Sequence, residues 1–282
     1  MNRSSSMLRR IKIGVATVLV TGLGIAGLAA SGASASSPEK EAVAKPTIVL
    51  IHGAFADASG WNGVVSKLQS MGYPTVAPAN PLRGLPSDTA YIKSVIAQID
   101  GPIILVGHSY GGMVMTNAAL DDPDVKGLVY VAAFAPAEGD SVGGLSNMFP
   151  GTMLTPANLV IRDYPTTDPN VLGKEAYINP TVFREVFAGD LSSKTAATMA
   201  ATQRPAELAS LGQPSGPPAW ATIPSWFIVS KNDNAIPAEV QRFMANRAHA
   251  VKTVELRASH VAMISQPGAV TALIVQAARY QG

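Results

Sequence analysis

The chain has 282 residues, of which 47% are hydrophobic and 14% charged, enough for one large α/β domain with a full core. It has no cysteine, which excludes disulfides, a thiol nucleophile and a cysteine metal site. Residues 1–35 hold four of the 21 basic side chains and no acidic one, so the remainder carries 17 basic and 19 acidic side chains. The net charge of that remainder is −2, compared with +2 for the whole chain, and it gives no reason to expect nucleic-acid binding.

The N-terminus has the three parts of a secretory signal. Basic residues up to Lys12 precede an apolar segment at 13–30, and the small residues Ala33-Ser34-Ala35 follow as a cleavage site. The segment is also near the length that spans a bilayer, but its glycines and threonines and the adjacent cleavage site favour removal. We expect a signal peptide at 1–35, a mature protein that begins at Ser36 without stable membrane insertion, and a secreted or extracytoplasmic location.

Short β-branched runs alternate with amphipathic segments along the mature chain, which indicates an α/β fold with a mostly parallel central sheet flanked by helices. The predicted strands are Thr47 to Ile51, Thr75 to Ala77, Ile103 to Val106, Leu128 to Ala133, Ser225 to Val229 and Thr253 to Leu256. The predicted helices are Gly60 to Met71, Thr89 to Ile99, Tyr110 to Leu120, Pro237 to Arg247 and Pro267 to Tyr280. Ser87 and Asp88 are the expected N-cap residues of the second helix.

Residues 135–218 interrupt this alternation. The segment is rich in Pro, Gly and Met and has short helical patterns at Pro180 to Ala188 and Ser192 to Ala201. It predicts a small helical lid above the carboxyl ends of the strands, inserted between a first core part at 36–134 and a second at 219–282. A disordered linker fits poorly, because aromatic residues such as Phe183 and Phe187 need a partner to bury against.

Gly107-His108-Ser109-Tyr110-Gly111 directly follows the apolar run Ile103 to Val106. This is the G-x-S-x-G pattern of a nucleophile elbow, in which a serine sits on a sharp turn from a strand into a helix. Small residues also form ordinary tight turns, so the pattern needs a base and an acid elsewhere in the chain.

The chain offers four histidines as the base that serine catalysis requires. His52 ends the first strand and is expected to hold its loop, His108 is locked into the elbow, and His249 lies at a helix end. His260 lies in the loop after the last strand, at the edge of the sheet where ligand-facing residues collect. His260 is therefore the predicted base.

Asp233 follows the strand Ser225 to Val229 and is the predicted acid. The order Ser109, Asp233, His260 is that of an α/β-hydrolase triad. Asp233 could instead cap the following helix, and Asp140 is then the substitute acid, with Glu138 a weaker one.

An oxyanion hole needs donors already aimed at the developing charge, and the backbone N–H groups of Tyr110 and Ala54 are the candidates. No metal site or cofactor is predicted: the acidic run 121–124 is typical of a solvated turn, and no G-x-G-x-x-G follows the first strand.

At these positions the chain resembles the α/β-hydrolase superfamily, and within it the branch of plant methylesterases and hydroxynitrile lyases. The resemblance implies a core sheet, a small lid and a triad of Ser109, Asp233 and His260. Lyases of this branch have threonine where Gly53 stands and lysine where Val261 stands, so the resemblance favours ester hydrolysis. The matching segments are Ile48 to Ala54 with Trp61, Gly107 to Gly112, Asp233 to Pro237 with Gln241-Arg242, and Ser259 to Met263.

These observations predict a secreted serine hydrolase that cleaves small or medium apolar or aromatic carboxylic esters through an acyl-enzyme. Its partner is a small-molecule ester. The alternatives are a lactonase or a cofactor-free perhydrolase on the same triad, lyase chemistry, or a hydrolase-like ligand-binding protein with little turnover. Apolar lid residues predict the substrate pocket, although they could simply pack the lid on the core: Met148, Met153, Leu154, Phe183, Phe187 and Met199.

Overall fold

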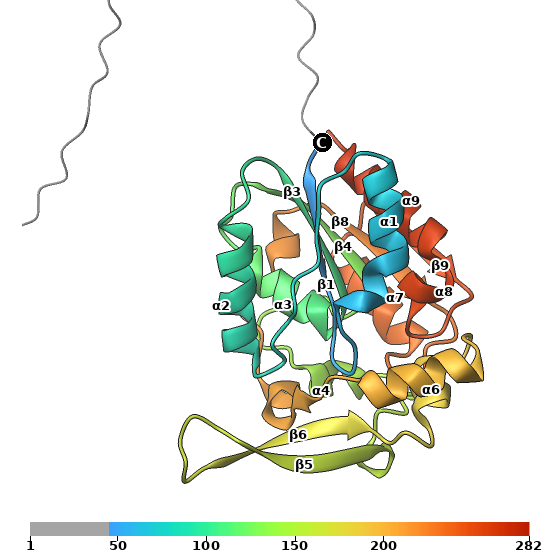
Figure 1. Cartoon of the computed structure of the whole chain (residues 1–282). Coiled ribbons are helices and arrows are strands. Elements are labelled where there is room, and N and C mark those ends of the chain that lie inside the picture. The colour runs from blue at the N-terminus through green and yellow to red at the C-terminus, as the bar shows by residue number, and fades with distance from the viewer. Residues whose placement is uncertain (1–44, 282) are drawn as a thin grey trace, which may run out of the picture. The chain divides into compact units, whose positions relative to one another are not determined.

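The computed structural model describes residues 45–281, and the predicted signal peptide and the cleavage site lie outside them. A six-stranded sheet in the order β2-β1-β3-β4-β8-β9 forms the centre, and every adjacent pair is parallel (Figure 1). Its strands are β1 (Thr47–Ile51), β2 (Thr75–Val76), β3 (Ile103–Ser109), β4 (Val125–Ala133), β8 (Ser225–Ser230) and β9 (Lys252–Leu256).

All six strands predicted from the sequence are confirmed, with ends that shift by at most three residues. The central strands β3 and β8 are buried along their whole length, because helices cover both faces of the sheet. Strands that are buried on both faces need continuous apolar runs rather than alternating ones, and the run Ile103 to Val106 therefore indicates a central strand.

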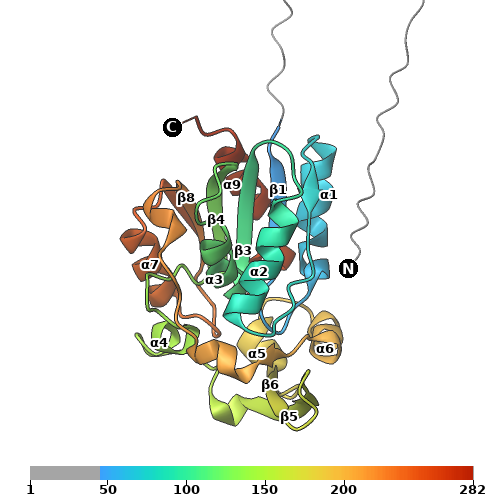
Figure 2. The same cartoon turned by 90° about the vertical axis from the view of Figure 1, so that its left-hand side faces the viewer.

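Helices cover the sheet on two sides. The helices α1 and α9 pack together on one face, α2 and α3 pack together on the other, and α7 packs against β8 (Figures 1 and 2). Within residues 45–281, no helix combines the length and the apolar character needed to cross a bilayer. The helices of this core are α1 (Asn62–Ser70), α2 (Leu85–Ile96), α3 (Tyr110–Ala118), α7 (Ala238–Arg247), α8 (Ala262–Ser265) and α9 (Pro267–Ala278), with 3-10 turns η1 (Ala58–Trp61) and η4 (Ala219–Ala221).

The start of α2 differs from the prediction. The helix begins at Leu85, with Gly84 as its N-cap and a proline in the first turn, so Ser87 and Asp88 lie inside it. The Asp88 carboxylate instead accepts the Arg83 backbone N–H at 3.0 Å from outside the helix. A proline in the first turn costs the helix no hydrogen bond, and this allows the earlier start.

The segment between β4 and β8 contains helices, as predicted, but it also contains a sheet. The strands β5, β6 and β7 form a three-stranded antiparallel sheet that lies with α6 beyond the carboxyl ends of the central strands (Figure 1). Every residue of β5 is exposed or half-buried, and its apolar run stops after Leu159 to Ile161, so the strand does not resemble a buried core strand. The elements of this insertion are α4 (Val142–Ser146), η2 (Pro156–Asn158), β5 (Leu159–Pro165), β6 (Leu172–Ile178), α5 (Phe183–Phe187), α6 (Ser193–Thr202), β7 (Ala206–Glu207) and η3 (Leu208–Gly212).

Candidate active site

Ser109 is the last residue of β3 and directly precedes α3, and its backbone is strained. Its φ of 52° and ψ of −127° lie where residues with a side chain are rarely found. A Cβ on Gly107 would lie 2.7 Å from the Gly112 Cα, so only glycine allows α3 to cross β3 this closely. The local sequence therefore builds the sharp elbow that the G-x-S-x-G pattern predicts.

The loop after β1 lies against this elbow through Gly53. A Cβ on Gly53 would lie 2.6 Å from the Ser109 Cβ and 3.1 Å from the Tyr110 nitrogen. The next residue, Ala54, is buried, and among the described residues its N–H donates no hydrogen bond. The absence of a side chain at Gly53 thus brings the Ala54 loop, with an uncommitted amide, beside the start of α3.

Asp233 and His260 meet although they are 27 residues apart: His260 Nδ1 lies 2.8 Å from Asp233 Oδ2, and both side chains are fully buried. Asp233 Oδ1 accepts the backbone N–H groups of Ala235 at 2.8 Å and Ile236 at 2.9 Å. These bonds hold the carboxylate in one orientation. The pairing leaves His260 Nε2 as the nitrogen that can accept a proton.

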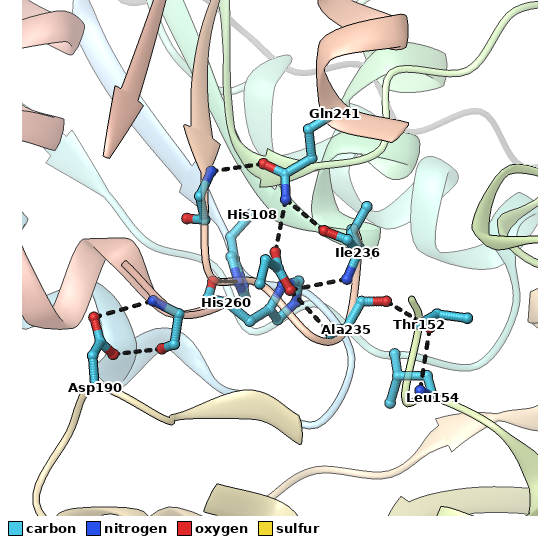
Figure 3. Close-up of polar contacts among 11 residues, drawn as sticks. His108, Thr152, Leu154, Asp190, Ala235, Ile236, Gln241 and His260 are labelled. Carbon is cyan, nitrogen blue, oxygen red and sulfur yellow. Dashed lines mark hydrogen bonds and ion pairs between the residues drawn. The ribbon is translucent and has the colours of Figure 1, made fainter. Parts of the chain in front are cut away.

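Gln241, on α7, supports the acid and was not predicted from the sequence as a site residue. Its Nε2 donates to Asp233 Oδ2 at 2.8 Å and to the Ile236 carbonyl at 2.7 Å, while its Oε1 accepts the Ser230 N–H at 2.9 Å (Figure 3). The sequence shows this glutamine only as part of the resemblance, because no local rule pairs residues eight apart on a loop and a helix.

His108 and Phe187 enclose His260. His108 Nε2 lies 3.0 Å from the His260 carbonyl oxygen, and the Phe187 ring lies 4.8 Å from the His260 ring. Burial, and then the neighbouring His260, hold the pKa of His108 well below the ordinary histidine value. His108 is therefore neutral and donates to that carbonyl. His260 Nε2 is buried and has no hydrogen-bond partner within residues 45–281.

The other histidines and carboxylates that the sequence singles out lie elsewhere. His52 accepts the Asn80 N–H on Nε2 at 3.0 Å and contacts the Gly53 carbonyl through Nδ1 at 2.9 Å, which makes it a loop-holding residue. His249 is exposed. Asp140 forms a 2.7 Å ion pair with Arg247, and Glu138 is exposed. Of the candidate acids, only Asp233 contacts His260.

Tyr110 is anchored beneath the elbow. Its hydroxyl donates to Asp88 Oδ2 at 3.0 Å, and both residues are buried. Burial, and then the Asp88 charge, raise the pKa of the Tyr110 phenol, so it stays protonated as a donor. Burial also raises the pKa of Asp88. This bond holds the first residue of α3, whose backbone N–H is a predicted oxyanion donor.

A cavity of about 270 Å³ lies between α6 and the loop after β1. Phe55, next to Ala54, and Val261, next to His260, form part of its wall together with Met199. Of the apolar lid residues predicted to form a pocket, Met199 lines this cavity, Phe183 and Phe187 are fully buried in the core, and Met148 is 45% exposed. Within residues 45–281, no group of three or more His, Cys, Asp or Glu side chains could hold a metal ion.

The profile of the Alpha/beta hydrolase family matches residues 48–273, so the chain belongs to this family. A pyrethroid hydrolase of Sphingobium wenxiniae is 29% identical over 78% of this chain and 83% of that protein. Methylesterase 8 of Arabidopsis thaliana is 24% identical over 81% of this chain and 88% of that protein. Among solved structures, polyneuridine aldehyde esterase has the same fold, with a TM-score of 0.70 at 20% identity over 83% of this chain and 99% of that one.

The predicted fold class and the resemblance to the plant methylesterase branch are therefore confirmed. The relatives are named esterases and hydrolases, which supports hydrolase activity on a small molecule for this chain.

Proposed function

We propose that this protein is an exported carboxylic ester hydrolase in which Ser109 is the nucleophile, His260 the general base and Asp233 the residue that orients His260. The observation that carries the proposal is the buried 2.8 Å contact between Asp233 Oδ2 and His260 Nδ1. This contact occupies Nδ1 and leaves Nε2, which has no hydrogen-bond partner among residues 45–281, for exchange of a proton with the nucleophile. The serine elbow of this chain belongs to the same family fold.

The acylation step uses each of these groups. His260 Nε2 takes the Ser109 proton while Oγ attacks the carbonyl carbon of the ester, and the backbone N–H groups of Ala54 and Tyr110 stabilise the resulting oxyanion. The C–O bond to the alcohol then breaks, and His260 gives its proton to the leaving alcohol. Water attacks the acyl-enzyme in turn, His260 takes one of its protons and returns it to Ser109 Oγ, and the carboxylic acid leaves.

The proposed substrates are small or medium esters with an apolar or aromatic group. The cavity beside Phe55 and Val261 supports this class through the apolar part of its wall, to which Met199, Met263 and Ile264 also belong. Apolar groups of a ligand gain from contact with this part, while Asp57, Ser59 and Asn62 offer polar groups and three further polar side chains already bond within the insertion. Those three side chains are Thr195, Thr202 and Gln203.

Hydrolysis is favoured over lyase chemistry because there is no room for a side chain at Gly53. The threonine that the resemblance associates with lyases would need a Cβ 2.6 Å from the Ser109 Cβ, so the elbow of this chain would have to move. Lactone hydrolysis and perhydrolysis would use the same residues. Export rests on the signal pattern at 1–35.

A fluorophosphonate probe tests the nucleophile on mature protein that begins at Ser36. We expect labelling of the wild type and none of Ser109→Ala with an unchanged circular dichroism spectrum. Well-folded wild type that resists labelling overturns the proposal and leaves a binding protein. A panel of p-nitrophenyl esters, aryl methyl esters and lactones then defines the substrate: turnover of charged esters alone would reject the apolar class.

A further inference from the structure

The loop that carries His260 is tied to the insertion by Asp190. Asp190 lies between α5 and α6, and its Oδ2 accepts the backbone N–H of Ser259 at 3.1 Å while its Oδ1 accepts the Ser259 hydroxyl at 2.5 Å (Figure 3). Ser259 is the residue directly before His260 and is 4% exposed. One carboxylate therefore receives both hydrogen bonds that Ser259 donates.

His260 is thus held from two sides. On the core side, His108 of β3 donates to the His260 carbonyl at 3.0 Å. On the other side, the tie runs through Ser259 to Asp190, an exposed residue of the insertion. The first contact belongs to the buried sheet, whereas the second depends on where the segment 183–192 lies.

The same segment also reaches the loop of the acid. Asn234, directly after Asp233, donates from Nδ2 to the Glu185 carbonyl of α5 at 2.9 Å. The Phe187 ring of α5 lies 4.8 Å from the His260 ring. Segment 183–192 therefore contacts both loops that supply the predicted base and acid.

We propose that Asp190 is a positioning residue, which sets the orientation of His260 through Ser259 so that the base is aligned only when segment 183–192 is in place. The proposal rests on the proposed function. Hydrogen bonds to a carboxylate are shorter and stronger than neutral ones, so two of them restrain the Ser259 backbone. The base must keep its position closely, because a misplacement of about 1 Å can lower a rate by about 100-fold.

Three variants separate positioning from a general structural role. Asp190→Ala removes both hydrogen bonds, and Ser259→Ala removes only the one made by the hydroxyl. In Asp190→Asn, the side-chain carbonyl oxygen can still accept the Ser259 N–H, and the side-chain NH₂ can donate to the Ser259 hydroxyl. Asp168→Ala is the matched control, because Asp168 is an exposed aspartate of the insertion whose side chain bonds only to Asn170.

For Asp190→Ala we expect kcat on a p-nitrophenyl ester to fall about 10- to 100-fold with KM within about threefold of wild type, since the altered contact acts on the base and not on bound substrate. The kcat of Ser259→Ala should fall less than that of Asp190→Ala. Asp190→Asn should retain most of the wild-type kcat, and the kcat of Asp168→Ala should equal that of wild type. Asp190→Ala leaves the N–H and the hydroxyl of the buried Ser259 without a partner, so its melting temperature should fall by several degrees, and kcat is therefore compared well below that temperature.

A readout independent of turnover is the downfield proton resonance of His260 Nδ1–H, which we expect to broaden or shift in Asp190→Ala and to persist in Asp168→Ala. A wild-type kcat and resonance in Asp190→Ala overturn the positioning role while the hydrolase stands. A rise in KM alone also overturns it. Wild type that neither labels nor hydrolyses esters rejects the function itself, which is a distinguishable failure.

Discussion

Replacing Gln241 by methionine tests the buried network behind Asp233. Methionine keeps the length of the side chain but has no N–H to donate to the Ile236 carbonyl and Asp233 Oδ2, and its thioether is only a weak acceptor for the Ser230 N–H. Gln241 is 1% exposed, so water cannot replace these partners.

The stability cost follows from the orphaned groups. The Ser230 N–H and the Ile236 carbonyl each cost about 1–3 kcal/mol when left unpaired, so Gln241→Met should lower the free energy of unfolding by about 2–6 kcal/mol. For a domain of this size, a loss of 1 kcal/mol lowers the melting temperature by about 2–4 °C, which predicts a fall of roughly 10 °C.

The activity cost is separate. Asp233 keeps its two backbone bonds and its contact with His260 but loses one charge-assisted hydrogen bond worth about 1.5–3 kcal/mol, so kcat should fall about 10- to 100-fold. Thermal unfolding by circular dichroism and ester hydrolysis well below the melting temperature measure the two effects. Gln276→Met, at an exposed position of α9, is the control. An unchanged melting temperature, or a full kcat in the folded variant, would refute the reasoning.

Three further perturbations have outcomes that the structure defines. Burial lowers the pKa of His52 and of His108, so the unfolded chain binds these protons at higher pH than the folded one; the free energy of unfolding should fall as pH drops below about 6.5, by up to about 1.4 kcal/mol per pH unit for each histidine. Urea unfolding at about pH 7.5 and 5.5 measures this, and a flat profile contradicts it. Asp140→Asn should leave kcat within about twofold, because Asp140 contacts Arg247 and the Ala137 N–H rather than His260, and the loss of a partly exposed ion pair should cost less than about 1 kcal/mol; a folded but inactive variant would contradict Asp233 as the acid. Arg83→Ala removes a 2.9 Å ion pair with Glu175 of β6 and should speed proteolysis of the exposed turn between β5 and β6, whereas unchanged cleavage would show that this pair does not hold the β5-β6-β7 sheet.

Local sequence patterns explain which elements and site residues could be predicted. Short β-branched and apolar runs predict the six core strands, and parallel strands end at one edge of the sheet, which is why Asp233 and His260 could be paired from their positions after β8 and β9. The apolar run of β5 is only three residues long and is followed by Arg162 and Asp163, and this exposed strand was missed. Gly53 and Gly107 stand where close backbone approach leaves no room for a side chain.

The sequence by itself determined the parallel α/β core, the elbow at Ser109 and the small set of side chains that could serve it. These depend on hydrophobic period and on glycine positions, which are local properties. Only the tertiary structure decided that Asp233 rather than Asp140 contacts His260, that Gln241 supports the carboxylate, and that Asp190 reaches Ser259 across 69 residues of chain. Such contacts depend on how loops from separate strands and the insertion pack together, and no spacing within the chain encodes them.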